Sequence, residues 1–275
     1  MKVSVIISTY NSPEWLEKVL WGYEVQTYRD FELIIADDGS GAATLDLLKK
    51  FRSQSSLEII HVWHEDRGFQ KSMILNAAIK AATTDYLIFS DGDCIPRKDF
   101  IEVHARNATA GYFLSGGYFM LPMSTSQAIS KEAIRSGQAF EVRWLRDNGL
   151  KNTYKVLKLT SKGPLEKILN FITPTKATWN GHNSSGWRKD IVAVNGFNEE
   201  MQYGGQDREL GERLVNYGVK GKQIRYSAVC IHLDHKRGYK TSESINKNRK
   251  IRSETRGQKK TWTEHGIEKS PLRTV

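Results

Sequence analysis

Residues 85–96 read Asp-Tyr-Leu-Ile-Phe-Ser-Asp-Gly-Asp-Cys-Ile-Pro, so two carboxylates follow directly on a short apolar run. The apolar residues 86–89 predict a buried strand. Asp91 and Asp93, at the end of such a strand, repel each other and lose solvation unless a positive charge compensates them. A divalent cation would do so, because Mg²⁺ and Mn²⁺ bind carboxylate oxygens and share their remaining coordination with phosphates. Gly92 leaves room for a ligand near the backbone, although a plain polar turn is the more common explanation of such a stretch taken by itself.

Upstream of this stretch, strand-like and helix-like segments alternate. We expect strands at 3–8, 31–36 and 57–62, and helices from Pro13 onward, at 44–51 and at 72–82. This order predicts an α/β fold with a mostly parallel, doubly wound sheet flanked by helices. Ligands bind beyond the carboxyl ends of the strands in such sheets. The acidic pairs at 37–38 and at 91 and 93 both fall at such ends.

The second half of the chain is less regular. We expect a helix at 99–104, one or two strands in 111–123, helices at 189–194 and after residue 203, and a last strand at 224–231. Residues 130–172 mix apolar and charged side chains, and a break is expected near Gly163 and Pro164. We interpret this part as amphipathic helices that line an acceptor cleft, touch a membrane surface or simply pack.

The composition suits one globular domain. The chain has 275 residues, 39% hydrophobic and 26% charged, which is ample for a core. Its apolar runs fall short of the ~18 residues of a spanning helix, and strand-like sequence begins at Val3 where a signal peptide would lie. Two cysteines without a metal-site spacing favour a reducing compartment. We therefore expect a cytoplasmic protein.

The net charge of +10 is concentrated near the C-terminus. Residues 236–260 contain ten Lys or Arg and two Glu. Such a stretch is a solvated basic surface, a site that holds the phosphates of a donor, or a surface attracted to an anionic membrane, and we favour the membrane over a donor's phosphates. Nucleic acid is not an expected partner, since a recognition motif is missing and the acidic clusters oppose it.

Several familiar nucleotide-binding motifs are missing after the first predicted strand. That strand is followed by Ser-Thr-Tyr-Asn at 8–11, with neither G-x-G-x-x-G nor a Walker lysine. These absences argue against an NAD-dependent dehydrogenase and a P-loop NTPase. A glycine-rich, arginine-containing loop typical of sugar-nucleotide synthesis is missing there too.

Four short motifs in order resemble the inverting family 2 glycosyltransferases, which have the GT-A fold. They are Ser-Thr-Tyr-Asn at 8–11, Ala-Asp-Asp-Gly-Ser at 36–40, Asp-Gly-Asp at 91–93 and Gln-Asp-x-x-Leu at 206–210. The C-terminal half also resembles the animal β-1,4-galactosyltransferases, through Asn-Gly-Phe at 195–197, Gly-Gly-Gln-Asp at 204–207 and the histidines at 232 and 235.

The resemblance implies a Rossmann-like sheet with a helical elaboration on the acceptor side. It implies one domain over 1–235, with a nucleotide-sugar-binding half at 1–123 and an acceptor-side half at 124–235. A basic extension would follow at 236–275.

The resemblance also implies roles for individual residues. Asp207 would be the general base, and its neighbour Gln206 departs from the Glu of the family. Mn²⁺ or Mg²⁺ would bind Asp93 and His235, with His232 as a further ligand. The donor would contact Thr9, Tyr10, Asn11, Asp37, Asp38, Arg67, Lys71, Asp91, Asp93 and Asn183.

The implied function is metal-dependent, inverting transfer of a sugar from a nucleotide-sugar donor, expected to be a UDP-sugar. The acceptor would be a hydroxyl of a glycan or a lipid-linked molecule in cell-surface polysaccharide or lipopolysaccharide synthesis. Such work would take place in the cytoplasm, with peripheral contact at the inner face of the membrane. The alternatives are a sugar nucleotidyltransferase and a nucleotide-sugar-binding protein without turnover.

Overall fold

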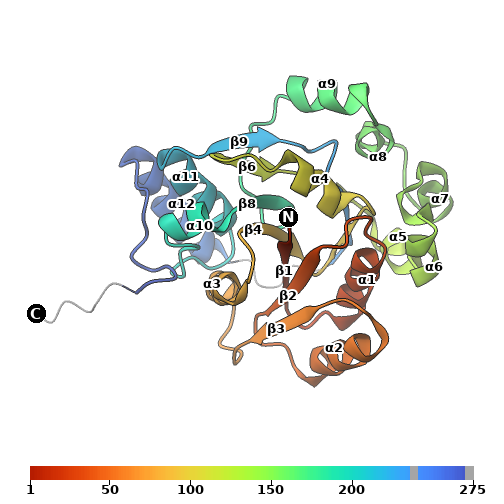
Figure 1. The fold of residues 1–275 in the computed structure, drawn as a ribbon, viewed down its shortest axis with the longest axis horizontal. Coiled ribbons are helices and arrows are strands. Elements are labelled where there is room, and N and C mark those ends of the chain that lie inside the picture. Colours follow the sequence, from red (N-terminus) through yellow and green to blue (C-terminus); the bar gives the residue numbers. More distant parts are fainter. Residues whose placement is uncertain (236–240, 270–275) are drawn as a thin grey trace, which may run out of the picture.

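A seven-stranded sheet forms the centre of the molecule in this computed structural model, which describes residues 1–235 and 241–269 (Figure 1). The strand order is β3-β2-β1-β4-β8-β6-β9. Only β8 runs antiparallel to its neighbours β4 and β6, so the predicted mostly parallel sheet is confirmed. The strands are β1 (Val3–Thr9), β2 (Phe31–Asp37), β3 (Ile59–Trp63), β4 (Tyr86–Asp91), β6 (Tyr112–Ser115), β8 (Ser184–Trp187) and β9 (Lys220–Gln223).

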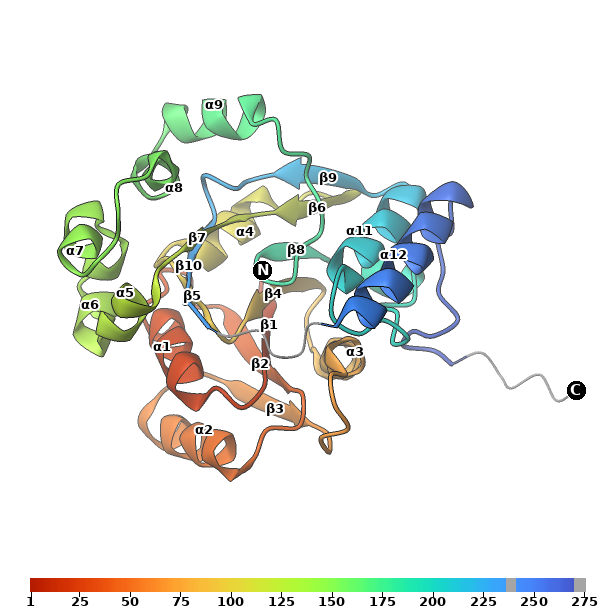
Figure 2. The same ribbon diagram turned by 180° about the vertical axis from the view of Figure 1, so that it is seen from behind.

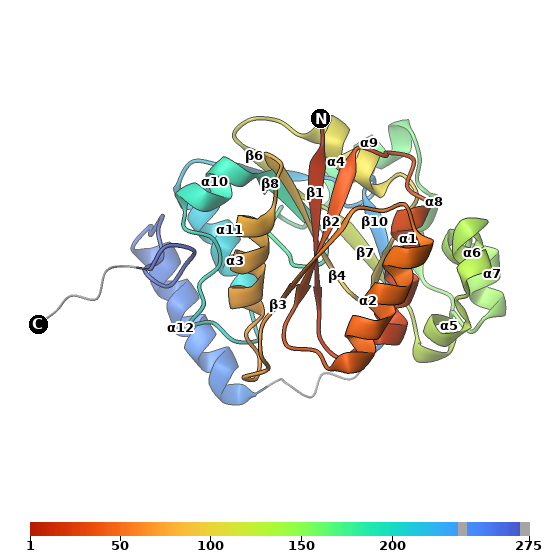
Figure 3. The same cartoon turned by 60° about the horizontal axis from the view of Figure 1, so that its bottom comes forward.

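Helices cover both faces of this sheet, as Figure 3 shows. Side chains of a strand alternate between the faces, so Val5 of β1 packs in the cluster that contains Leu16, whereas Ile6 packs in the cluster that contains Ile79. All four side chains are fully buried or nearly so. The first face carries α1 (Pro13–Glu24) and α2 (Ala42–Gln54), and the second carries α3 (Lys71–Ala81), α10 (Arg188–Ala193) and α11 (Gln206–Asn216).

A second, three-stranded sheet joins distant parts of the chain. Its order is β5 (Cys94–Pro96), β10 (Val229–His232) and β7 (Gly117–Met120), with β10 in the middle. The antiparallel pairing of β10 with β5 sets His232 opposite Cys94. This long-range register brings a late histidine beside the acids that end β4.

The excursion predicted to be helical is confirmed as helical. Figure 2 shows its elements along the outer edge of the molecule. The predicted break is also confirmed, because α9 begins at Pro164, and proline is well tolerated in the first turn of a helix. The elements after α4 (Phe100–Asn107) and β7 are α5 (Met123–Ala128), α6 (Lys131–Arg135), η1 (Gln138–Phe140), α7 (Val142–Asp147), η2 (Tyr154–Val156), α8 (Leu157–Thr160) and α9 (Pro164–Ile172).

The predicted last strand at 224–231 is wrong in its extent. The structure has β9 before residue 224 and starts β10 only at Val229. Between them the chain turns, with the amides of Ser227 and Ala228 both donating to the Ile224 carbonyl oxygen. The apolar run is interrupted because the chain leaves the large sheet here and enters the small one.

The basic C-terminal stretch is largely an ordered helix, α12 (Ser242–Gly257), packed against α11. Its inner face is polar: Ser244, Asn248 and Thr255 are buried, and Asn248 Nδ2 donates to the Gln202 carbonyl oxygen at 2.9 Å. As predicted for a largely solvated stretch, most side chains of 241–260 are exposed, while 236–240 lie outside the described residues. Hydrophobic periodicity could not reveal this helix, because hydrogen bonds rather than apolar contacts hold its inner face.

Contacts between α12 and α11 also involve charge. Arg252 Nη2 lies 2.5 Å from Glu212 Oε1. Polar and charged contacts therefore join α12 to the part of the chain before residue 235. Among the helices of 1–235 and 241–269, none is long and apolar enough to cross a membrane.

Candidate active site

A cavity of about 770 Å³ opens at the carboxyl ends of β1 and β4, where the fold class predicts a ligand. Loops from both halves of the chain contribute to it. Of the predicted site residues, ten line the cavity, and Asp37, Arg67 and Asn183 lie outside the lining. The lining comprises Ser8, Thr9, Tyr10, Asn11, Ser12, Trp15, Asp38, Gly68, Phe69, Lys71, Asp91, Gly92, Asp93, Tyr118, Met120, His182, Tyr203, Gln206, Asp207, His232 and His235.

Asn183 does not face the cavity, which corrects its predicted donor role. Its side chain is fully buried. Its Nδ2 donates to the carbonyl oxygens of Gly117 at 2.7 Å and Ala228 at 3.0 Å, and its Oδ1 lies 2.9 Å from His104 Nε2. Asn183 therefore joins the two sheets, and its neighbour His182 is the residue that points to the cavity.

Asp37 and Arg67 also lie apart from the cavity lining. The Asp37 carboxylate accepts from the Ser40 amide at 2.8 Å and pairs with His61 at 2.9 Å, and its side chain is buried. It stabilises the turn after β2 rather than facing the cavity. Arg67 is exposed and pairs with Glu65 at 3.0 Å.

Gly92 allows the backbone of β1 to approach the end of β4 closely. A Cβ there would lie 3.1 Å from the Ser8 carbonyl oxygen and 3.0 Å from Thr9 Oγ1. The Gly92 amide donates to the same Ser8 carbonyl at 2.7 Å. The glycine therefore joins the end of β4 to β1, and it also lines the cavity.

Polar loops after β1 and β2 form one end of the cavity. Asn11 has a positive φ of 45°, and its Oδ1 accepts from the Gly41 amide at 2.9 Å, so it ties the two loops together. Asp38 accepts from the Gln70 amide at 3.0 Å and contacts His64 at 2.8 Å. Burial raises the pKa of Asp38, and His64 and the Gln70 amide act against that rise. This end is rigid and rich in hydrogen-bonding groups.

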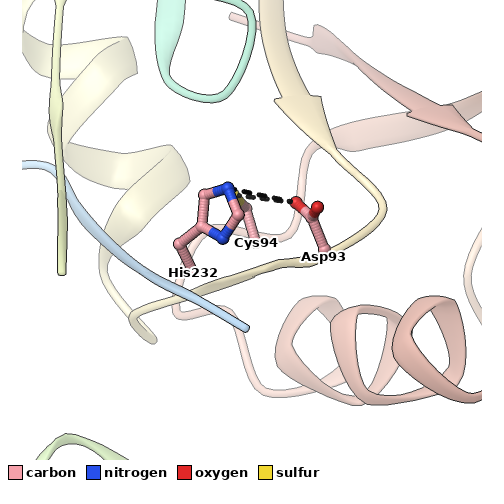
Figure 4. Close-up of side chains that lie close together, drawn as sticks. All are labelled: Asp93, Cys94 and His232. Carbon is pink, nitrogen blue, oxygen red and sulfur yellow. Dashed lines mark hydrogen bonds and ion pairs between the residues drawn. The ribbon is translucent and has the colours of Figure 1, made fainter. Parts of the chain in front are cut away.

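Asp93, His232 and His235 converge on one point beside the strand ends. Asp93 Oδ2 lies 3.0 Å from His235 Nε2, and Asp93 Oδ1 lies 3.9 Å from His232 Nε2. Figure 4 shows Asp93 and His232 pointing toward each other. The two imidazole rings stack with centroids 5.5 Å apart and planes 7° apart.

His232 has the tautomer that a metal ligand needs. Its Nδ1 lies 2.8 Å from the Leu233 carbonyl oxygen, which can only accept, so Nδ1 carries the proton. Nε2 then faces Asp93, as in metal sites where a carbonyl oxygen orients the histidine. One carboxylate with two imidazoles is a mixed oxygen and nitrogen donor set that fits a divalent transition metal.

Cys94 also lies within reach of this cluster, together with Asp93 and His232. Its thiol lies 3.4 Å from Asp93 Oδ1 and donates to it. Burial raises the pKa of Cys94 well above its usual range. Thiolates suit soft metals, whereas Mn²⁺ and Mg²⁺ prefer oxygen ligands, so Cys94 is the donor of this cluster least suited to those two ions. The histidines remain as the nitrogen donors.

Lys71 compensates the other acid, Asp91. Its Nζ lies 2.6 Å from Asp91 Oδ1, to which Ser8 Oγ also donates at 2.7 Å. Burial opposes ionisation of Asp91, but the charge and hydrogen bond of Lys71 outweigh it and lower the pKa of Asp91 to about 2. Burial likewise acts to lower the pKa of Lys71, and the carboxylates of Asp91 and Asp207 outweigh it and raise that pKa.

Asp207 stands in the first turn of α11, against the loop that carries Gly181. A Cβ at Gly181 would lie 2.9 Å from Asp207 Oδ1 and 3.0 Å from Oδ2, so only glycine leaves room for the carboxylate. Oδ1 is buried and lacks a hydrogen-bond partner among the residues that the structure describes. Burial raises the pKa of Asp207, Lys71 lowers it and Asp91 raises it. An acid with these properties can accept a proton from a ligand.

Several lining residues were missed in the sequence. His182 belongs to the glycine-punctuated loop before β8, and burial lowers its pKa to about 4, so the ring is neutral. It packs edge-on against Tyr118 at 4.6 Å. Phe69 and Tyr203 meet edge-to-face at 5.9 Å. The loop of His182 carried a signal in its polar, glycine-rich pattern, and Phe69 opens a Phe-Gln-Lys segment at 69–71 that also resembles the galactosyltransferases.

Residues 4–155 match the family model for glycosyl transferase family 2. The chain belongs to this family. This membership confirms the predicted family and reaction class, so the protein is a glycosyltransferase, and it leaves the sugar nucleotidyltransferase alternative without support. The finer resemblance of the C-terminal half to β-1,4-galactosyltransferases stays a prediction.

Two relatives illustrate this similarity in sequence. The uncharacterized glycosyltransferase YfnE of Bacillus subtilis is 27% identical over 280 residues, which cover 90% of this chain and 69% of YfnE. Validoxylamine A glucosyltransferase of Streptomyces hygroscopicus subsp. jinggangensis is 26% identical over 236 residues, which cover 79% of this chain. The glycosyltransferase chain described here matches only 52% of that enzyme's length.

Solved structures share the fold of this glycosyltransferase. The mannosyltransferase PcManGT of Pyrobaculum calidifontis, in complex with GDP-Man and Mn²⁺, superposes with a TM-score of 0.58 at 19% identity, covering 86% of this chain and 58% of its own. Residues 1–349 of Staphylococcus aureus TarS, in complex with UDP-GlcNAc, superpose with a TM-score of 0.59 at 18% identity, covering 94% and 69%. The predicted GT-A fold is confirmed.

Proposed function

We propose that this glycosyltransferase moves a sugar from a nucleotide-sugar, with a UDP-sugar as the first candidate, to a hydroxyl group with inversion at the anomeric carbon. One observation about Asp207 carries the proposal. This residue lines the cavity, and its buried Oδ1 lacks a hydrogen-bond partner in the described part of the chain. TarS binds UDP and UDP-GlcNAc in its solved structures, which supports a UDP-sugar.

The reaction is a single displacement. The acceptor oxygen forms a bond to the anomeric carbon, while the bond from that carbon to the diphosphate oxygen breaks and the nucleoside diphosphate leaves with the electron pair. Asp207 takes the proton of the acceptor hydroxyl. Its raised pKa makes it a better proton acceptor than an exposed Asp. A covalent intermediate on the protein is not needed.

Asp93, His235 and His232 would hold a divalent cation, Mn²⁺ or Mg²⁺, and PcManGT was solved with Mn²⁺. When bound, such a cation would offset the negative charge of the departing diphosphate. The two histidines favour Mn²⁺ over Mg²⁺, because imidazole nitrogen suits transition metals better than Mg²⁺.

Lys71 holds the acids of the site in their charged forms. Its ammonium faces both Asp91 and Asp207. It therefore keeps Asp91 ionised at the end of β4 and limits the rise of the pKa of Asp207. Thr9, Tyr10, Asn11 and Asp38 would bind the base and ribose of the donor at the rigid end of the cavity.

The acceptor is proposed from the relatives. TarS of S. aureus is a poly(ribitol-phosphate) β-N-acetylglucosaminyltransferase and is 30% identical to this chain over 104 residues. We infer a glycan or lipid-linked acceptor in the synthesis of cell-surface polymers on the cytoplasmic side.

Release of nucleoside diphosphate from a panel of UDP-, GDP- and dTDP-sugars, with Mn²⁺, with Mg²⁺ and with EDTA, tests this function. We expect metal-dependent release from a UDP-sugar, accelerated by a glycan acceptor. Binding of UDP without release from any donor in the presence of mixed glycan acceptors would instead indicate a binding protein without turnover.

A further inference from the structure

Helix α9 is amphipathic, but it turns its polar face to the protein and its apolar face to solvent. Glu166 Oε1 accepts from Ser227 Oγ at 3.1 Å. Asn170 accepts from the Tyr226 amide at 2.9 Å and donates to Ser227 Oγ at 2.8 Å. A helix that covers a core has the opposite orientation, so the orientation of α9 requires another explanation.

The outer face of α9 is strongly apolar and exposed. Leu165, Ile168 and Ile172 follow helical spacing on one face, and they are 49%, 54% and 61% exposed. Phe171 beside them is 90% exposed. The preceding elements η2 and α8 add Tyr154 and Leu157, which are 80% and 43% exposed. Exposed apolar side chains gathered in one place mark an interaction surface.

The exposed charged side chains of residues 151–176 are all positive. Residues 151–176 contain six lysines and one carboxylate, that of Glu166. Glu166 is turned inward, as its bond to Ser227 shows. Lys158 is also turned inward, over the ring of Tyr118. The remaining five, all exposed, are Lys151, Lys155, Lys162, Lys167 and Lys176.

We propose that this α9 surface docks on an anionic lipid bilayer; we define it as Tyr154, Leu157, Leu165, Ile168, Phe171, Ile172 and the five exposed lysines. An apolar face flanked by lysines fits the boundary between acyl chains and anionic headgroups. A helix of nine residues cannot span a bilayer of ~30 Å, so α9 lies in the plane of the interface. Phe171 and Tyr154 supply aromatic side chains at headgroup depth.

A second copy of the chain fits this surface less well. Two copies that met through α9 would bring their exposed lysines together, and like charges repel. An anionic membrane instead offers compensating charge at the depth where the lysine ammonium groups lie. Charge complementarity therefore selects the bilayer as the occupant.

The position of α9 leaves the cavity accessible. Figures 1 and 2 both place α9 at the outer edge of the molecule, away from α1, α2 and α3. The cavity lining that the structure describes takes no residue from 124–181. Docking through α9 is therefore a function separate from sugar transfer. It anchors the enzyme through residues that do not belong to the cavity lining.

Co-sedimentation of the full chain with vesicles tests the proposal. The probes are vesicles of phosphatidylcholine alone and vesicles with roughly 30% phosphatidylglycerol. We expect binding only to the anionic vesicles, and a loss of about tenfold or more in the I168S/F171S double variant. Both side chains are exposed, so the variant should unfold at the wild-type temperature and release nucleoside diphosphate at the wild-type rate with a soluble acceptor.

Matched variants make the test specific. V215S/Y217S removes two other exposed apolar side chains, 54% and 50% exposed, from the end of α11, and it should bind vesicles like the wild type. Equal binding by I168S/F171S and the wild type, or binding lost only in R249Q/K250Q of α12, would overturn the proposal. Loss of self-association rather than vesicle binding in I168S/F171S would point to a second copy and also overturn it.

Discussion

Lys71 Nζ lies 2.6 Å from Asp91 Oδ1, whereas Asp93, two residues further on, faces His235 at 3.0 Å. The two acids of the Asp-Gly-Asp sequence therefore have separate compensating partners. Lysine neutralises the first, and a pair of imidazoles faces the second. These separate partners matter for function. Asp93 stays available to bind a cation, and Lys71 links Asp91 electrostatically to Asp207.

Asp207→Asn should abolish turnover and spare donor binding. The amide cannot accept the acceptor proton, so kcat should fall by about 10²- to 10⁴-fold. Sugar transfer under saturating donor measures the loss, and calorimetric titration with UDP measures binding. Asp46→Asn, an exposed acid on α2, serves as control. Normal turnover by Asp207→Asn would show that another group is the base.

Asp93→Asn should remove the metal dependence of donor binding. We expect UDP affinity in Mn²⁺ to fall by about 10- to 100-fold, to the level of the wild type in EDTA, with no further loss when EDTA is added to the variant. Cys94→Ser should keep Mn²⁺-dependent binding, since Mn²⁺ favours carboxylate and imidazole ligands over a thiolate. Undiminished UDP affinity of Asp93→Asn in Mn²⁺ would contradict the metal assignment.

Lys71→Met should shift the pH dependence of kcat. Asp207 must be deprotonated to act as a base, so activity rises with pH through its pKa. Lys71 holds that pKa down against burial. Without the lysine the pKa rises further, and the acid limb of the kcat profile moves to higher pH. Lys80→Met, an exposed lysine on the same helix, should leave the limb in place. If the acid limb of the kcat profile stayed in place in Lys71→Met, Lys71 would not control the pKa of the catalytic base.

Gly181→Ala should damage catalysis more than stability. The new methyl group would lie 2.9 Å from Asp207 Oδ1, so the carboxylate has to move. Displacement of about 1 Å can cost roughly 10²-fold in rate. Gly257→Ala is the matched control, because a Cβ at the end of α12 meets open space. Unchanged kcat in Gly181→Ala would mean that the carboxylate position is not critical.

His104 should make stability depend on pH between 6.5 and about 4. Burial lowers its folded-state pKa from 6.5 to about 4. The unfolded chain therefore binds the extra proton first, and the free energy of unfolding falls as pH drops from 6.5 toward 4. A shift of this size corresponds to about 3 kcal/mol.

Urea unfolding across this pH range measures the effect. His104→Gln should flatten part of the slope, while His182 contributes the rest, because burial lowers its pKa over the same window. His265→Gln changes a half-exposed histidine and should leave the slope as it is. An equal slope in His104→Gln and the wild type would rule out His104 as its source.

The fold could be predicted from the sequence because its signals are local. Buried parallel strands read as short β-branched or apolar runs, as in residues 3–8 and 31–36, and the structure confirms both within one residue. Helix α12 could not be predicted in this way. Its buried residues are polar and hydrogen-bond to backbone groups of a distant segment, so its packing leaves no hydrophobic period.

The candidate site was predictable in part. Acids that end parallel strands must meet at one edge of the sheet, which placed Asp38, Asp91 and Asp93 together. Asn183 was misplaced because the side chains of adjacent residues point in different directions, and only the loop conformation makes His182 the one that faces the cavity.

The sequence by itself determined the alternation of strands and helices up to residue 91, the edge of the sheet where the acids gather, and the family through four ordered motifs. Tertiary structure alone decided that Lys71 pairs with Asp91 while two histidines face Asp93, and that α9 shows its apolar face to solvent. The physical reason is that the periodicity of apolar residues shows only which side chains lie on the same face of a helix or strand. The partner on that side comes from a distant part of the chain, as when β10 brings His232 opposite Cys94.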